Sequence, residues 1–346
     1  VHFPSVSDSQ RTEITRVPGM RAVQITRLDG PEAVTVDDVD EPSGDGITID
    51  VHAAGVAFPD ALLSRGLYQY KPDLPFSPGG EVAGVVRSAP EGAHVRPGDR
   101  VLGLTMITGG MAEVVVLPPD RVFPLPNNVS FEAGAGVLFN DLTVLFALRT
   151  RGRLMPGETV LVHGAAGGIG TSTLRMAGPL GAARTIAVVS TEDKVDIATA
   201  AGADDVVLAD GFKDAVMELT GGRGVDIVLD PVGGDRVTDS LRSLAPAGRL
   251  LVVGFTGGDI PTIKTNRLLL NNVDVVGVGW GAWTMKHPGY LAEQWDELSA
   301  LLEAGTVPAP QPHVFPLERA GEAIASLENR SARGKVVLRV VESTNH

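Results

Sequence analysis

The segment His163–Gly170 reads HGAAGGIG and joins a buried apolar run, ETVLVHG, to a helix-like run, GIGTSTLRMAG. A glycine-rich turn between a strand and a helix is typical of dinucleotide-binding sites. There the backbone approaches a pyrophosphate, and the first helical N–H groups bind it. The match is imperfect because Ala165 stands where the first glycine of G-x-G-x-x-G would be. The alternative is a glycine-rich turn that binds no ligand. Cofactor contacts are predicted at Ala166, Gly167, Gly168, Ile169 and Gly170.

The chain around this turn alternates between strand-like and helix-like runs. The predicted strands are 158–164, 184–190, 204–208, 224–230, 248–255 and 273–279. The predicted helices between them are 168–178, 194–202, 212–222, 235–245 and 265–272. Such alternation makes a parallel, doubly wound sheet covered by helices, so we expect an α/β fold with a Rossmann domain. This alternation also favours a dinucleotide site at the glycine-rich turn over a turn that binds no ligand.

The residues before and after this region show a different residue pattern. From Met20 to Leu125, short β-branched runs are separated by Gly, Pro and Asp turns, which is typical of a β barrel or sandwich piece. The last run, KVVLRVV at 335–341, is expected to return to this β part. The Rossmann sheet is therefore predicted to be inserted into a mostly β, partly open, barrel-like catalytic domain. The predicted division is 1–19 for a flexible N-terminal extension, 20–139 with 284–346 for the catalytic domain, and 140–283 for the Rossmann domain.

Composition excludes several classes of function. The 346 residues carry a formal net charge of −13 and no basic run, which argues against binding to nucleic acid or to an anionic membrane. Cysteine is absent, so disulfides, thiolate zinc sites, iron–sulfur clusters and a cysteine nucleophile are excluded. No apolar stretch is long enough to span a bilayer, and the first residues lack the apolar core of a signal peptide. We therefore expect a cytoplasmic protein whose partner is a small molecule.

The end of the second predicted strand indicates which nucleotide would bind. An acidic residue there holds the ribose 2′-hydroxyl of NAD. Here the strand ends in Ser190, and Lys194 follows one turn later. A hydroxyl and an ammonium group suit a 2′-phosphate, so NADPH is the predicted cofactor. Glu192 and Asp193 lie between them, and either carboxylate could point inward and oppose this interpretation.

Several segments occur in an order that is similar to a known family. They are SRGLYQY, LPFSPGGEVAGVV, VRPGDRV, FNDLTVLFAL, AAGGIG, GVDIVLDPVGG and GRLLVVGF. From about Met20 to Val341 the chain resembles the medium-chain dehydrogenases/reductases, in their zinc-free, zeta-crystallin-like quinone oxidoreductase branch. The resemblance implies an enzyme that passes hydride from NADPH to a small-molecule electron acceptor, which would be a quinone or a small α,β-unsaturated carbonyl.

The resemblance also indicates how the metal ligands of zinc-dependent relatives are replaced. Their ligand histidine precedes a glutamate, and here Gly80 stands before Glu81. Their first cysteine ligand falls at Ala57, which cannot bind metal, and the cysteine-rich structural-zinc loop is missing. No metal site is expected. Hydride addition to an enone or quinone is compatible with this, because it needs an oriented nicotinamide and modest support for an enolate oxygen.

The resemblance further implies roles for individual residues. Asn140 and Thr143 would lie by the nicotinamide, and Gly254 and Phe255 would lie beside the cofactor at the end of the fifth strand. Tyr68 would face the substrate and is the candidate catalytic residue; a packed surface tyrosine is the alternative. Two departures leave the substrate open: Ala57 replaces a frequent Asn, and Leu62 replaces a frequent Tyr.

Two other functions stay open at this point. An enoyl-thioester reductase acting on a CoA or acyl-carrier substrate uses the same fold, and a non-enzymatic NADPH-binding protein is known in this branch. The last strand of the Rossmann domain, Val273–Gly279, is apolar and ends an open sheet. Such an edge invites pairing with a second copy, so we expect a homodimer joined through residues 273–279.

Overall fold

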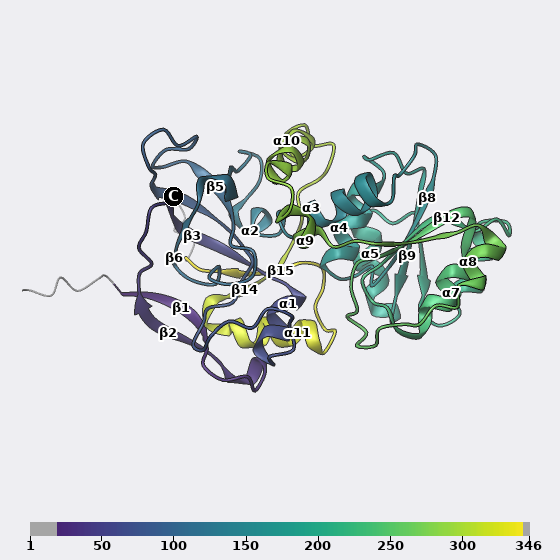
Figure 1. Ribbon diagram of the computed structural model, residues 1–346, viewed down its shortest axis with the longest axis horizontal. Helices are drawn as coiled ribbons and strands as arrows, with labels where there is room; N and C mark the ends of the chain where they lie inside the picture. Colours follow the sequence, from purple (N-terminus) through teal and green to yellow (C-terminus); the bar gives the residue numbers. More distant parts are fainter. Residues whose placement is uncertain (1–18, 342–346) are drawn as a thin grey trace, which may run out of the picture.

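The computed structural model describes residues 19–341. The predicted flexible extension, 1–19, lies outside the described residues except for Gly19, which begins the first strand. Two sheets form opposite ends of an elongated molecule, with helices between them (Figure 1). None of the helices in residues 19–341 combines the length and the apolar character needed to cross a lipid bilayer.

One sheet is the predicted Rossmann sheet. Its strands are β8 (Thr159–His163), β9 (Arg184–Val189), β10 (Asp205–Leu208), β11 (Val225–Asp230), β12 (Leu244–Val252) and β13 (Asp274–Gly277). All neighbouring strands are parallel, in the order β10-β9-β8-β11-β12-β13. The strand order reverses between β8 and β11, and ligands of such sheets bind at the carboxyl ends of the strands near this point. The prediction of a doubly wound parallel sheet is confirmed.

The helices of this part begin and end close to the predicted residues. They are α4 (Gly168–Ala177), α5 (Val195–Ala200), α6 (Phe212–Leu219), α7 (Val237–Arg242) and α8 (Asn266–Asn271), with single 3₁₀ turns η4 (Glu192–Lys194) and η5 (Gly234–Arg236). Helix α4 ends directly before Gly178 and Pro179, because proline cannot continue a helix. The fifth strand is the main difference: β12 ends at Val252, so Gly254 and Phe255 lie beyond it.

The second sheet is mostly antiparallel. Its order is β14 (His313–Pro316), β15 (Val336–Arg339), β3 (Ile47–Val56), β4 (Glu81–Ser88), β5 (Arg100–Leu104) and β7 (Val122–Pro124). The start of β3 also pairs with β6 (Val114–Leu117), whereas its end pairs with β15, so β3 is shared between two neighbours on one side. The closing strand of the chain therefore returns to the N-terminal β part, as predicted.

Smaller elements complete this part of the molecule. They are the hairpin β1 (Gly19–Ile25) and β2 (Val34–Asp40), the helices α1 (Phe58–Ser64) and α11 (Ala320–Glu328), and the 3₁₀ turns η1 (Pro31–Ala33), η2 (Pro119–Arg121) and η6 (Leu317–Arg319). Helices α1 and α11 lie side by side at one edge of the β part (Figure 1).

A group of helices lies between the two sheets. They are α2 (Phe131–Gly134), α3 (Asn140–Leu145), a π-helical turn η3 (Phe146–Arg151), α9 (Trp280–Thr284) and α10 (Tyr290–Glu303). The hydroxyl of Ser130 accepts a hydrogen bond from the N–H of Ala133, which fixes where α2 begins.

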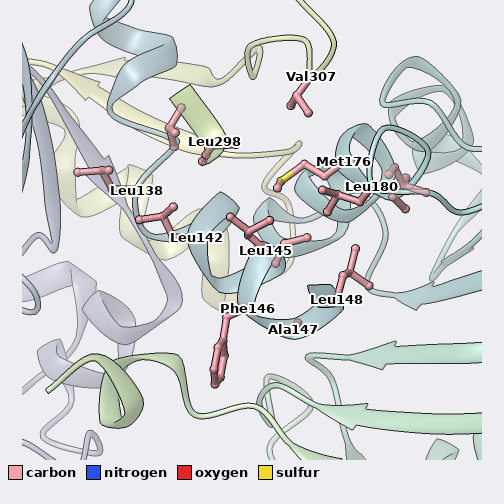
Figure 2. Close-up of a cluster of buried hydrophobic side chains, with 14 of the residues drawn as sticks. Leu138, Leu142, Leu145, Phe146, Ala147, Leu148, Met176, Leu180, Leu298 and Val307 are labelled. Carbon is pink, nitrogen blue, oxygen red and sulfur yellow. The ribbon is translucent and has the colours of Figure 1, made fainter. Parts of the chain in front are cut away.

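One continuous apolar core runs through this group. It reaches from Leu102 in β5 to Leu229 in β11, and the side chains of α3, α4 and α10 fill its middle (Figure 2). Both sheets therefore share this core, which fixes α3 between them. The proposed domain boundaries lie within this junction, 139/140 directly before α3 and 283/284 at the last residue of α9, and they remain predictions.

Candidate cofactor and substrate site

The glycine-rich turn approaches its neighbours closely. A Cβ atom at position 170 would collide with the carbonyl oxygen of Gly164, and one at position 168 would collide with Nδ2 of Asn140. Helix α4 begins after Gly167 without a side-chain cap, so its first N–H groups are left to another partner. The turn thus offers the free N–H donors that a pyrophosphate requires. A dinucleotide fits these residues.

Helix α3 carries Asn140 and Thr143 onto this turn. Both side chains are buried, and Asn140 lies against Gly168. The Thr143 hydroxyl donates to the carbonyl oxygen of Phe139 at 2.6 Å, so its oxygen remains an acceptor for a bound group. The N–H of Phe139 donates to Oε2 of Glu81 at 2.8 Å, which ties the start of α3 to β4. The structure therefore brings Asn140 and the glycine-rich turn together, and Thr143 follows one helical turn later in α3.

The predicted 2′-phosphate residues also lie together. Nζ of Lys194 is 3.3 Å from the hydroxyl of Ser190 and donates to the carbonyl oxygen of Arg330 at 2.7 Å. Asp193, one of the two acids that could oppose a phosphate, lies 3.4 Å from the guanidinium of Arg333. A hydrogen bond from the Thr191 hydroxyl lowers the pKa of Asp193, and the charge of Arg333 lowers it further.

Gly254 and Phe255 lie at the same edge of the sheet, next to the segment that follows β11. A Cβ at Gly233 would be 2.8 Å from the ring of Phe255, and the N–H of Thr256 donates to the carbonyl oxygen of Pro231 at 3.0 Å. These contacts hold the carboxyl ends of β11 and β12 side by side.

Tyr68 follows helix α1 and is half-buried. Burial raises the pKa of its phenol, and the carboxylate of Asp60 raises it further. Within residues 19–341 no hydrogen bond connects Tyr68 with Asn140 or Thr143. The charge of Asp60 therefore acts on the Tyr68 phenol, and the catalytic role of Tyr68 stays a prediction.

Asp60 is a functional candidate that the sequence analysis missed. It is 2% exposed and accepts hydrogen bonds from the N–H groups of Ala57, at 2.8 Å, and Gly79, at 2.9 Å. Burial raises its pKa from 3.8 to about 6. The signal in the sequence was the segment Ala57–Asp60, in which a proline and then an acid follow the residue before a helix.

Gly80, which stands where zinc-dependent relatives carry a ligand histidine, has no space for a side chain. A Cβ at Gly80 would lie 2.8 Å from the carbonyl oxygen of Met106 and 3.2 Å from the ring of Phe139. A larger side chain there would displace both. Among residues 19–341 no group of three or more His, Asp or Glu side chains is arranged to hold a metal ion.

Glu81 and Lys335 form a second pair that the sequence analysis missed. Nζ of Lys335 lies 2.6 Å from Oε1 of Glu81, and both side chains are buried. Glu81 is the charged residue of the apolar run GGEVAGVV, and Lys335 directly precedes the apolar residues 336–338 in GKVVLRVV. A charge in such a position requires a partner, and this was the available signal.

The fold and the site define a class of protein. A doubly wound sheet with a glycine-rich turn, joined to a β domain that holds the last strand of the chain, is the architecture of two-domain dehydrogenases and reductases. Residues 168–303 match the family described as zinc-binding dehydrogenase. Residues 43–127 match the alcohol dehydrogenase GroES-like domain.

Individual relatives agree with this class. The chain is 37% identical to the quinone oxidoreductase-like protein 2 of Rattus norvegicus over 84% of each chain. A probable oxidoreductase from Mycobacterium abscessus is 40% identical, with a TM-score of 0.86 over 94% of this chain and 100% of the other. Escherichia coli quinone oxidoreductase, solved in complex with NADPH, is 28% identical, with a TM-score of 0.81 over 92% and 100%. The chain belongs to the medium-chain dehydrogenase/reductase family, in its quinone oxidoreductase-like branch.

Proposed function

We propose that this protein is an oxidoreductase that binds NADPH and transfers hydride, without a metal ion, to a quinone or a small α,β-unsaturated carbonyl. The observation that carries the proposal is the contact of Asn140 with Gly168, which sets a polar side chain of α3 directly on the glycine-rich turn. The NADPH complex of the related Escherichia coli enzyme supports the choice of cofactor.

Each predicted residue has a place in this proposal. The N-terminus of α4, with Ala166–Gly170, would hold the pyrophosphate. Ser190 and Lys194 would hold the 2′-phosphate, because their hydroxyl and ammonium groups are adjacent. Asn140, Thr143, Gly254 and Phe255 would surround the nicotinamide half.

The bound NADPH would supply the hydride. The acceptor oxygen gains negative charge as the acceptor carbon takes up this hydride, so a nearby donor lowers the barrier. Tyr68 would donate a hydrogen bond to that oxygen and then its proton. A tyrosine phenol is protonated at neutral pH, as a donor must be, and burial raises the pKa of Tyr68 further above neutrality. Asp60, which lies in α1 eight residues earlier, would orient this end of the site.

The test is an NADPH-oxidation panel with quinones, enals and enoyl thioesters. Turnover of quinones or enals, reduced in Tyr68→Phe, would support the proposal. Turnover confined to enoyl thioesters would instead assign an enoyl-thioester reductase. Binding of NADPH with no oxidation across the panel would favour a non-enzymatic nucleotide-binding protein.

We also propose a homodimer that pairs two β13 strands. Strand β13 ends the sheet, and two hollows of about 350 and 420 Å³ flank it. They are lined by residues of β13 together with Arg151, Trp283 and Leu268. An edge strand with space beside it is open to a second strand. The cytoplasmic location expected from the sequence stays a prediction.

A further inference from the structure

The segment Asn329–Lys335 comes from the far end of the chain but lies along the carboxyl edge of the Rossmann sheet. The N–H of Gly334 donates to the carbonyl oxygen of Ala166 at 2.8 Å, and Gly334 forms a parallel bridge with Gly167. The carbonyl oxygen of Arg330 accepts from Lys194 at 2.7 Å. The segment therefore touches both the glycine-rich turn and the residues proposed for the 2′-phosphate.

One end of this segment is fixed in the protein interior. Lys335 is 4% exposed and pairs at 2.6 Å with Glu81 in β4. Arg333 precedes Lys335 by two residues, so its backbone is held at the edge of the sheet while its side chain extends into solvent. From this backbone position the guanidinium reaches Asp193 in the turn η4, which follows β9.

The partner of Arg333 in the structure is exchangeable. The guanidinium lies 3.4 Å from a carboxylate oxygen of Asp193, and the two side chains are 57% and 64% exposed. Exposed pairs of this kind contribute little to stability. A phosphate can replace this carboxylate, because it accepts the same two parallel hydrogen bonds from a guanidinium and carries more negative charge.

We infer that Arg333 determines the preference for a 2′-phosphorylated dinucleotide: in the free protein it pairs with Asp193, and on binding it contacts the 2′-phosphate together with Lys194. This inference rests on the proposed NADPH function and adds a residue from the catalytic part to the cofactor site. Recognition of the adenosine end then requires both parts of the molecule, with the buried Lys335–Glu81 pair holding the segment in place.

Direct binding of four probes tests the inference: NADPH, NADH, 2′,5′-ADP and 5′-AMP, each titrated by calorimetry. Arg333→Gln should weaken NADPH and 2′,5′-ADP about tenfold or more, as expected for one lost charge-assisted contact, and leave NADH and 5′-AMP unchanged. Arg242→Gln is the matched control. Arg242 ends α7, pairs with Asp239 at 3.2 Å and is similarly exposed, so the same charge is removed elsewhere.

A double variant distinguishes a direct contact of Arg333 with the phosphate from an effect of Arg333 on the charge of Asp193. Arg333→Gln with Asp193→Asn removes both members of the pair. If Arg333 contacts the phosphate, the double variant stays weakened toward 2′,5′-ADP. Full recovery would mean that Arg333 acts only by masking Asp193, and the inference would be overturned.

Failure of the proposed NADPH function can be told apart from failure of the inference about Arg333. If the unmodified protein binds NADPH and NADH equally, the cofactor assignment and this inference both fail. If Lys194→Ala loses NADPH selectivity while Arg333→Gln retains it, only the inference about Arg333 fails.

Discussion

The ammonium nitrogen of Lys335 lies 2.6 Å from Oε1 of Glu81, and the side chains are 4% and 1% exposed. Oε2 of the same carboxylate accepts from the N–H of Phe139 at 2.8 Å. Burial raises the pKa of Glu81, and the charge and hydrogen bond of Lys335 oppose that shift. A single carboxylate therefore joins β4, the start of β15 and the start of α3, directly beside the position where zinc-dependent relatives carry a ligand.

Removal of one member of this pair should be strongly destabilising. Lys335→Met leaves the Glu81 charge buried without its partner, and we expect a loss of about 3–5 kcal/mol in the free energy of unfolding. Urea denaturation measures it. The double variant Lys335→Met with Glu81→Leu should recover much of the loss, because no charge then remains unpaired. A single variant as stable as the parent protein would contradict the burial of this pair.

Asp60 should make stability depend on pH. Its pKa is raised from 3.8 to about 6 by burial, so between these values the folded protein binds more protons than the unfolded chain. The stabilisation is fully present below 3.8 and is lost as the pH rises through about 6. The difference between these two pKa values corresponds to roughly 3 kcal/mol in the free energy of unfolding.

The measurement is urea unfolding of the parent protein and of Asp60→Asn between pH 4.5 and 8. The asparagine does not titrate, so the parent should lose stability relative to the variant as the pH rises. Parallel curves for the two proteins would show that Asp60 keeps an ordinary pKa.

Lys194 should control the choice between the two nicotinamide cofactors. Lys194→Ala removes one charge-assisted contact, worth about 1.5–3 kcal/mol, and should weaken NADPH about tenfold or more while NADH is unaffected. Fluorescence titration measures both affinities. Lys213→Ala, which removes an ammonium from α6, is the control. Equal affinity of the parent protein for NADPH and NADH would refute the assignment.

The purified protein should contain no stoichiometric zinc, and a chelator should leave its activity unchanged. Gly80→His should not create a zinc site. Its Cβ would lie 2.8 Å from the carbonyl oxygen of Met106, so the variant should lose stability instead. Elemental analysis and thermal unfolding measure the two effects. Zinc found at one equivalent, with activity lost on its removal, would overturn the metal-free proposal.

A proline on the open edge of β13 should prevent dimer formation. The N–H of Val278 donates to Val252 in β12, so strand alternation turns the N–H of Val276 inward and that of Val275 outward. Arg151 already binds the outward carbonyl oxygen of Gly277. Val275→Pro removes an outward donor and spares the β12 pairing. Light scattering should report about twice 36.1 kDa for the parent and a monomer for the variant. A monomeric parent at micromolar concentration would exclude the dimer.

Most of the Rossmann sheet could be predicted from the sequence, because its signals are local. Six apolar runs separated by helical periods predict six parallel strands, and Gly178-Pro179 predicts the end of α4. The start of α2 is set locally as well, because the hydroxyl of Ser130 accepts a hydrogen bond from an N–H only three residues away.

Short elements of the β part gave weaker signals. Helix α1 has seven residues, which is too few for a helical period to repeat, and it lies in a region that reads as strands. Its Asp60 becomes informative only when Gly79, 19 residues later, is seen to donate to the same carboxylate.

The sequence by itself determined the alternation of strands and helices, the glycine-rich turn and the family, because each depends on residues that are neighbours along the chain. Only the tertiary structure decided that Lys335 meets Glu81, 254 residues away, and that Arg333 meets Asp193 across 140 residues. Contacts of that separation leave no periodic pattern in the sequence. They exist because the last strand crosses back to β3 and carries its preceding segment past the edge of the other sheet.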